Sequence, residues 1–335
     1  MIGSLLGLVA LAAYPPAPGD LQFANIGDLK LQSGQTLRDC RVGYRVFGLL
    51  DAAKDNVVLW PTWYLGTSAD LAGNIRPGGP ADPTKFCVIA VDALTNGVST
   101  SPSNSKLQHD SAFPTVGIRD MVKSQHSMLE KMGITHLRAV MGISMGGIQA
   151  FQWITAYPDF MDEAIPIVGS PRPSSYDLMF YTAGIKALTA AIKKPDARED
   201  LIRTYGDYFM LALNTPTFYA SHTKRDGAVA NMDGFSQGLL RWDPYDMLTG
   251  LQAVTDQDIF KPFGEDEAKA AAAVHAKLFV ISASQDHCVN PAPALEFAGL
   301  LGAATMVLDD PEGHSSPGAE WAKVNPAVEK FLETR

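Results

Sequence analysis

A serine between two glycines is the part of this sequence whose residue types and spacing best fit covalent chemistry. Residues 142–146 read Gly-Ile-Ser-Met-Gly, and they follow an apolar run at 137–141. Apolar residues at helical spacing come next, up to Pro158, where a helix cannot continue. Strand, tight turn and helix in this order are the setting of a nucleophile elbow, which presents a serine hydroxyl at the turn. We therefore interpret Ser144 as a catalytic nucleophile.

The two flanking glycines have a steric role in this interpretation. A strand that reverses abruptly into a helix forces its tip residue into a sparsely populated backbone conformation, and neighbours without a Cβ allow the two arms to approach. Gly142 and Gly146 stand at those positions. The amide of Met145 then points towards the serine at a helix N-terminus, where developing negative charge is stabilised. For the motif alone, a glycine–serine turn without chemistry remains the alternative.

A serine hydroxyl is a weak nucleophile at neutral pH and needs a base, which a third group must orient. In this architecture the acid and then the histidine follow the serine, each after a late strand. The apolar run 277–283 leads to Asp286, and the run 304–308 leads to His314. Both order and position fit, so we predict Ser144, Asp286 and His314 as the catalytic residues.

Other residues compete for these two roles. His287 is next to Asp286 in sequence, which would leave the serine out of its reach, and we interpret it as a surface or supporting residue. Asp309 and Asp310 are nearer to His314, but we expect them to fix the turn of that loop. A different acid remains the main alternative. The other histidines follow no late strand: His109, His126, His136, His222 and His275.

The loop after the first parallel strand is expected to supply a second hydrogen-bond donor for the oxyanion. This reasoning places the backbone amide of Trp63 opposite that of Met145, with the amides of Thr62 and Tyr64 as alternatives. We also predict that Thr62 and Tyr64 contribute to the substrate pocket. Trp63 could wall the pocket as well, because the predicted donor is its backbone.

The elements that must position these residues indicate an α/β protein with a mostly parallel sheet covered by helices on both faces. Two strands separated by residues 32–36 suggest an antiparallel start. Apolar strands and helical segments then alternate, which is typical of a parallel sheet. The predicted strands are 21–31, 37–47, 56–60, 86–92, 137–141, 163–168, 277–283 and 304–308, and the predicted helices of this layer are 118–132, 148–158 and 321–332.

Residues 171 to about 272 interrupt this alternation. They are rich in Pro, Tyr and Met, contain helical stretches at 176–191 and 199–213, and lack a convincing apolar strand. We predict a helical cap at 171–265, inserted into an α/β core that comprises 21–170 and 266–335. A cap in this position could line the mouth of an active site, since substrate pockets favour domain junctions.

Composition excludes several classes of function. The 335 residues are 46% hydrophobic and 19% charged, as in an ordinary globular protein. The net charge of −9, without a block of Lys or Arg, disfavours nucleic acid as a partner. No apolar run has the length of about 20 residues that a membrane span needs. The sequence has neither metal-ligand spacing nor a glycine-rich phosphate loop, and its three cysteines cannot form a disulfide framework, so we expect no metal and no cofactor.

The N-terminus resembles part of a secretory signal. Residues 2–13 are largely apolar and end in small residues, and a proline-rich linker follows, so we predict a leader and linker at 1–20. A positively charged start is missing. We favour export to the periplasm or the medium over the alternative, an apolar tail on a cytoplasmic protein.

At this point the sequence resembles the homoserine O-acetyltransferase family of the α/β-hydrolase fold. Residues 113–123 (FPTVGIRDMVK) and 142–149 (GISMGGIQ) are similar to segments of that family, and residues 241–248 (RWDPYDML) echo its cap. The likeness extends over most of residues 35–332. It implies an α/β-hydrolase fold with Ser144, Asp286 and His314 as its triad, and an activity that moves an acyl group.

The sequence departs from the family where the acyl acceptor is chosen. Family members resemble one another in an aspartate directly after the catalytic histidine, which is associated with the substrate amine; here Ser315 follows His314. A buried ammonium group without its anion is costly. The oxyanion loop also differs, reading Pro-Thr-Trp-Tyr-Leu-Gly at 61–66.

These departures favour water as the acceptor. We therefore predict a serine hydrolase acting on a small carboxylic ester or related acyl compound. An O-acyltransferase using acetyl-CoA or another acyl-CoA is the alternative, and a non-catalytic binding protein with the same fold is a third reading. A homodimer is compatible with the sequence.

Overall fold

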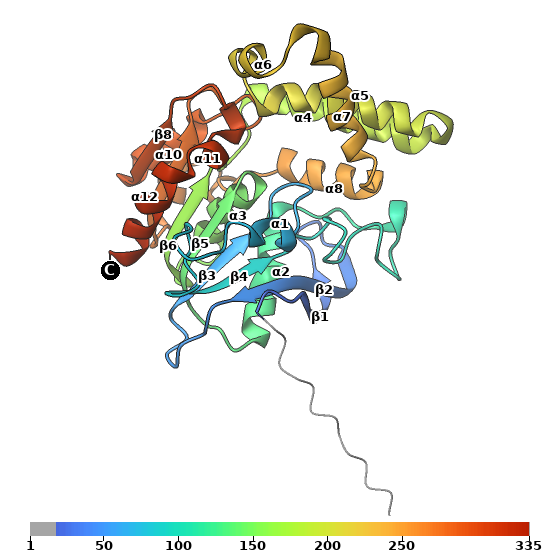
Figure 1. Ribbon diagram of the computed structural model, residues 1–335. Helices are drawn as coiled ribbons and strands as arrows, with labels where there is room; N and C mark the ends of the chain where they lie inside the picture. The colour runs from blue at the N-terminus through green and yellow to red at the C-terminus, as the bar shows by residue number, and fades with distance from the viewer. Residues whose placement is uncertain (1–17, 335) are drawn as a thin grey trace, which may run out of the picture.

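The computed structural model describes residues 18–334, which form one eight-stranded sheet with helices on both sides (Figure 1). The strand order is β1-β2-β4-β3-β5-β6-β7-β8. β1 is antiparallel to β2 and β2 to β4, whereas β3 to β8 are parallel. The predicted α/β class with a mostly parallel sheet is confirmed. The strands are β1 (Gln22–Lys30), β2 (Thr36–Phe47), β3 (Val57–Pro61), β4 (Cys87–Val91), β5 (Leu137–Ile143), β6 (Met161–Ile167), β7 (Lys277–Ala283) and β8 (Ala304–Leu308).

The burial of each strand follows from its place in the sheet. Every residue of β3 and β4 is buried, because these strands have neighbours on both edges and helices on both faces. Their sequences therefore read as continuous apolar runs. β1 lies at one edge, and in its first half partly buried residues alternate with exposed ones, as expected for an antiparallel strand with one face in solvent.

Two helical layers bury the faces of the sheet. On one face, α2 (Ile118–Lys131), α3 (Met145–Ala156) and α10 (Ala292–Leu301) share an apolar cluster that includes Val122, Phe151 and Phe297. On the other face, α1 (Ser68–Ala72) and α12 (Trp321–Glu333) contribute Leu71, Val324 and Val328 to a second cluster. This packing fixes the sheet between them.

The chain between β6 and β7 is helical. Its helices are α4 (Ser175–Lys193), α5 (Arg198–Leu213), α6 (Pro216–His222), α7 (Ala228–Leu239), α8 (Pro244–Thr255) and α9 (Glu267–Ala272). In Figure 1, α4 to α7 stand beyond one end of the strands, and α8 lies between them and the sheet. Helices α4 to α8 lie within residues 171–265, the segment predicted as the cap, and α9 lies just beyond it; the limits of that cap remain a prediction.

The predicted leader cannot be compared with the structure, since it falls mostly on residues 1–17, outside the described part of the chain. Within residues 18–334, no helix is both long and apolar enough to cross a membrane. The loops that follow β3, β5, β7 and β8 emerge at the carboxyl ends of parallel strands, so they meet at one edge of the sheet. The short helix α11 (Ser316–Ala319) belongs to the last of these loops.

Candidate active site

Ser144 occupies a strained turn between β5 and α3. Its backbone angles are φ 57° and ψ −122°, a conformation that residues other than glycine rarely adopt. A Cβ at Gly142 would lie 2.3 Å from the carbonyl carbon of Gly146, and a Cβ at Gly146 would lie 2.5 Å from the carbonyl oxygen of Pro61. Gly142 therefore permits the close approach of β5 and α3, as the sequence predicted, whereas Gly146 is required by the end of β3, which the sequence reasoning did not anticipate.

The structure brings Ser144, His314 and Asp286 together from three different loops. His314 Nε2 lies 2.8 Å from Ser144 Oγ, and His314 Nδ1 lies 2.7 Å from Asp286 Oδ2. A carboxylate can only accept, so Nδ1 carries the proton and donates it to Asp286. Nε2 of the neutral ring is then an acceptor, and the hydroxyl of Ser144 donates to it. Asp286 and His314 are both buried.

The remaining oxygen of Asp286 is held by the backbone. Asp286 Oδ1 accepts hydrogen bonds from the amides of Cys288 and Val289, each at 2.8 Å. The carboxylate is thus fully engaged and its orientation towards His314 is fixed. Burial raises the pKa of the neighbouring Cys288 thiol well above its ordinary value, so this cysteine is not available as a nucleophile.

The residues that competed in sequence for the roles of acid and base have other positions or partners in the structure. Asp310 Oδ1 accepts from the amide of Glu312 at 2.8 Å, and Asp309 Oδ1 accepts from Ser284 Oγ at 2.6 Å, so both carboxylates shape the loop that leads to His314. His287 is partly exposed and is not one of the residues that line the pocket beside Ser144.

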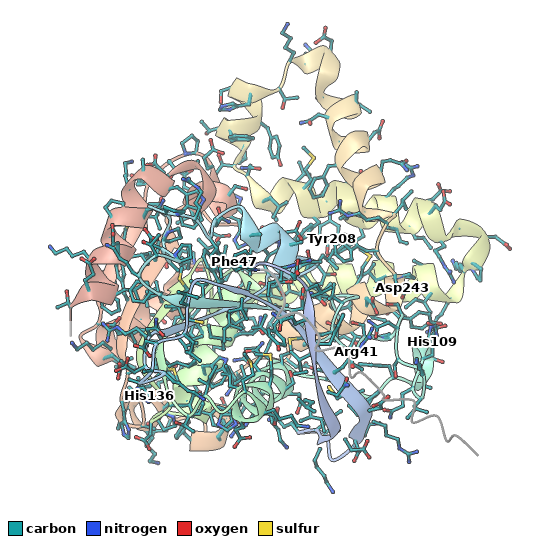
Figure 2. All side chains as sticks on the ribbon, turned by 60° about the horizontal axis from the view of Figure 1, so that its bottom comes forward. Arg41, Phe47, His109, His136, Tyr208 and Asp243 are labelled. Carbon is teal, nitrogen blue, oxygen red and sulfur yellow. The ribbon has the colours of Figure 1, made fainter. Side chains whose placement is uncertain are left out.

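The other histidines have local partners. His109 and His136 are labelled far apart at the periphery of the molecule in Figure 2 and lie next to Asp110 and Asp162, respectively. His126 stacks on Tyr157, His222 on Phe218, and His275 lies beside Asp159.

The loop after β3 is a tight turn over the site. The amide of Gly66 donates to the carbonyl of Trp63 at 3.0 Å, and a Cβ at Gly66 would clash with the indole of Trp63. Ser144's own amide donates to Ile167, so the first amide of α3 that lacks an intrahelical acceptor beside the serine is that of Met145. Among the backbone hydrogen bonds of the described loops, none uses the Trp63 amide.

One predicted pocket residue is misplaced. Thr62 is fully buried, its amide donates to the Val91 carbonyl at 3.1 Å, and its Oγ1 accepts from the amide of Ala93 at 3.0 Å. It is not among the residues that line the cavity beside Ser144. Its amide is also excluded as an oxyanion donor, since strand pairing with β4 uses its hydrogen.

A cavity of about 430 Å³ opens beside Ser144. Tyr64 and Trp63 are among its lining residues. The Tyr64 hydroxyl donates to the carbonyl of Met247 at 2.9 Å and accepts from Tyr205 at 3.2 Å, so this side chain joins the loop after β3 to α8 and α5. Burial raises the pKa of Tyr64, which keeps it a neutral wall residue.

Of the other side chains of this cavity, the sequence reasoning singled out Ser315 as the residue after His314, and it assigned no pocket role to the rest. Most are aromatic or aliphatic and come from α5, α7 and the C-terminal loops, and no aspartate or glutamate stands among the described lining residues. Their helices were foreseen in part, but no local signal shows which helical face points at Ser144. The additional lining residues are Leu65, Asn74, Ile143, Phe209, Leu213, Phe235, Leu239, Arg241, Trp242, Ser315, Pro317, Gly318 and Trp321.

A hydroxyl on a strained turn, a histidine in contact with it and a carboxylate behind the histidine form the arrangement that permits acyl transfer through a serine ester. On this fold, that arrangement defines the class of serine-dependent hydrolases and acyltransferases. Residues 66–317 match the family described as alpha/beta hydrolase fold, and the chain belongs to that family.

Named relatives include both hydrolases and acyltransferases. The chain is 31% identical over 329 residues to an ethyl acetate hydrolase of Pseudomonas veronii, an alignment that covers 88% of this chain and 94% of the relative. It is 31% identical over 181 residues to a homoserine O-acetyltransferase of Zymomonas mobilis, covering 49% of this chain and 48% of the relative. The resemblance to the acetyltransferases is thereby confirmed, and the protein is an enzyme of the hydrolase and acyltransferase type.

A solved structure also shows similarity to an esterase over most of the chain. The crystal structure of the acetyl esterase MekB superimposes with a TM-score of 0.88 at 29% identity, covering 95% of this chain and 98% of that one. The similarity therefore includes the helical segment between β6 and β7 as well as the sheet.

Proposed function

We propose that this protein is a serine esterase that hydrolyses small carboxylic esters, with Ser144, His314 and Asp286 as its catalytic residues. The observation that carries the proposal is the continuous chain of contacts from Ser144 through His314 to Asp286, which ends at a mostly apolar cavity. The full-length similarity to an ethyl acetate hydrolase supports an ester substrate.

The contacts suggest the following proton movements. His314 Nε2 takes the proton of Ser144 as its Oγ attacks the ester carbonyl, and then returns it to the leaving alcohol. Asp286 keeps Nδ1 protonated and stabilises the imidazolium that forms. The tetrahedral oxyanion accepts hydrogen bonds from the amides of Met145 and Trp63. Water then attacks the acyl-enzyme, again with His314 as base.

The cavity favours small, uncharged esters. Its volume of about 430 Å³ is at the lower end of the range typical of ligand pockets, roughly 300 to 1,000 Å³. Trp63, Tyr64 and Trp242 supply a largely apolar lining, in which an alkyl chain gains from leaving water. Acetyl and other short acyl esters of small alcohols are the substrates that we propose, in line with the names of the relatives.

Turnover of p-nitrophenyl acetate without coenzyme A tests this proposal. The purified protein should hydrolyse the ester steadily and should react with a fluorophosphonate at one serine, located by mass spectrometry. Ser144→Ala should lose both properties, with turnover falling by about 10⁴-fold or more. Normal turnover by Ser144→Ala would refute the assignment of the nucleophile.

A second candidate, acyl transfer from acyl-CoA to an alcohol, is favoured by the similarity to homoserine O-acetyltransferases over about half of the chain. Incubation with acetyl-CoA and homoserine distinguishes the two. We expect little O-acetylhomoserine, because the described pocket lining offers no carboxylate for the substrate's ammonium group. Efficient formation of that product without ester hydrolysis would favour the transferase.

We also propose that two copies associate. The first turns of α4 expose Tyr176, Leu178 and Met179, with Met179 67% accessible, and a second copy would cover these apolar side chains. Sedimentation velocity of the wild type and of Met179→Glu tests this: a dimer that the substitution weakens supports the proposal, and a monomeric wild type contradicts it.

A further inference from the structure

The loops that carry Asp286 and His314 are both hydrogen-bonded to the helical segment between β6 and β7. We propose that this segment, besides walling the pocket, positions the two residues: Asp177 and Tyr181 hold the loop of Asp286, and Asn214 and Thr215 hold the loop of His314. The inference rests on the proposed function, since it assigns a positioning role for the same three catalytic residues.

The contacts on the histidine loop come from the junction of α5 and α6. Thr215 Oγ1 donates to the carbonyl of Pro311 at 2.5 Å, and Asn214 Nδ2 donates to the carbonyl of Glu312 at 2.8 Å. The amide of Thr215 also reaches the Pro311 carbonyl, at 3.4 Å. Two successive carbonyls that lead directly to His314 are therefore fixed from outside the sheet.

The shape of the loop agrees with this dependence. Gly313 has φ +64°, and a Cβ there would face the carbonyl of Gln285 at 3.2 Å, the carbonyl of Leu213 at 3.4 Å and Thr215 Cγ2 at 3.4 Å. The backbone before His314 thus lies close to both the loop of Asp286 and the α5–α6 junction. Any displacement of that junction would move the histidine relative to Ser144.

The contacts on the acid loop come from α4. Asp177 Oδ1 accepts from the amide of Asn290 at 3.0 Å, and the Tyr181 hydroxyl donates to the carbonyl of Cys288 at 2.8 Å. Cys288 is one of the two residues whose amides hold Asp286 Oδ1. Helix α4 therefore holds the backbone of residues 288–290, and the amide of Cys288 in turn holds the carboxylate of Asp286.

Thr215 is the best position for a test, because it is 1% exposed and its hydroxyl has two identifiable partners. It donates to Pro311 and accepts from the amide of Phe218 at 3.1 Å, which caps α6. Thr215→Val keeps the shape of the side chain and removes both hydrogen bonds, whereas Thr215→Ser keeps both. Thr217→Val is a matched control on an exposed residue of the same helix.

We expect Thr215→Val to lower kcat for p-nitrophenyl acetate by about tenfold to a hundredfold, the loss typical of a small misplacement of a reacting group. The rate constant of fluorophosphonate labelling should fall in parallel, while KM should change less than about threefold, since Thr215 does not line the pocket. Thr215→Ser and Thr217→Val should both behave as the wild type.

The melting temperature of each variant separates positioning from stability. A Thr215→Val protein that is folded at the assay temperature and has wild-type kcat and labelling rate would overturn the inference. If Ser144→Ala retained turnover, the proposed function itself would fail. Loss of activity in Ser144→Ala together with normal Thr215→Val kinetics would remove only the positioning role. If Thr215→Val does not fold, Asn214→Ala removes the neighbouring contact and is expected to show the same fall in kcat.

Discussion

The identity of the base can be tested at the level of single residues, because this chain carries two histidines close to Asp286. His287 follows Asp286 in sequence, and His314 is 28 residues away, yet only His314 contacts both Asp286 and Ser144. The side chain of His287 points in a different direction from that of Asp286, because the two residues are adjacent in the chain. Strand β8, in contrast, brings His314 back to the edge of the sheet where Asp286 lies.

Replacement of these histidines should therefore have unequal effects. His314→Ala should lower kcat/KM for p-nitrophenyl acetate by about 10⁴-fold, because Ser144 loses its proton acceptor. His287→Ala is the matched control and should change it less than about threefold. Steady-state kinetics of both proteins measure the difference; a severe loss in His287→Ala with a mild one in His314→Ala would transfer the role of base to His287.

The choice of acyl acceptor can also be tested at a single residue. Ser315 lines the cavity, and within residues 18–334 its hydroxyl makes one long hydrogen bond, from Oγ to the Leu213 carbonyl at 3.5 Å. Ser315→Asp would place an anion next to His314, where an amino acid's ammonium group could pair with it. We expect O-acetylhomoserine formation to rise by about tenfold to a hundredfold from its low starting value, as measured by mass spectrometry. No change in that product would show that acceptor choice lies elsewhere.

At the level of elements, the sequence predicts what depends on local patterns and fails where long-range packing decides. All eight strands were predicted to within a few residues, since central parallel strands read as apolar runs. The need for Gly142 beside Ser144 was also predictable, because it follows from the local geometry of a strand–turn–helix motif. Thr62 was wrongly placed in the pocket. Its amide donates to the carbonyl of Val91, which is 29 residues away in sequence, and its hydroxyl accepts from the amide of Ala93.

The pocket's aromatic side chains show the same limit. Phe209 and Phe235 belong to α5 and α7, and they reach the cavity only because those two helices pack together beyond the sheet. Helical periodicity identifies that such helices have an apolar face, but not what that face covers. The hydrogen bonds from Thr215 to the histidine loop join residues 96 apart and have no sequence signal at all.

The elbow itself offers a test at this level. Gly142→Ala would put a Cβ 2.3 Å from the backbone of Gly146, so β5 and α3 must move apart and the turn at Ser144 must relax. We expect loss of measurable esterase activity and a melting temperature lower by several degrees. Gly234→Ala in α7 is the control: nothing lies within 4 Å of its Cβ, and the substitution should be neutral or stabilising. Wild-type kinetics in Gly142→Ala would show that the close approach is dispensable.

For the molecule as a whole, the cluster of Ser144, Asp286 and His314 and a buried ion pair lie at opposite ends of the parallel strands. Arg138 in β5 donates to Glu163 Oε1 in β6 at 3.0 Å, and its guanidinium also donates to the carbonyl of Leu332 in α12 at 2.5 Å. This cluster joins the closing helix to the start of the sheet. Glu163 Oε2 is buried and has no hydrogen-bond partner within the described residues. Burial raises the pKa of Glu163 to about 7, and the charge of Arg138 offsets only part of this effect.

The stability of the whole fold should therefore depend on pH through Glu163. Its folded pKa of about 7 exceeds its ordinary value of 4.5, so the folded state holds a proton that the unfolded state releases. The resulting stabilisation is complete below pH 4.5 and is lost as the pH rises through 7, by up to about 3 kcal/mol. Glu163→Gln cannot titrate, so its free energy of unfolding in urea should fall less than that of the wild type between pH 4.5 and 8. Glu199→Gln, at an exposed position of α5, should keep the wild-type slope. Equal slopes in Glu163→Gln and the wild type would mean that Glu163 is already ionised in the folded protein, with Arg138 stabilising its charge.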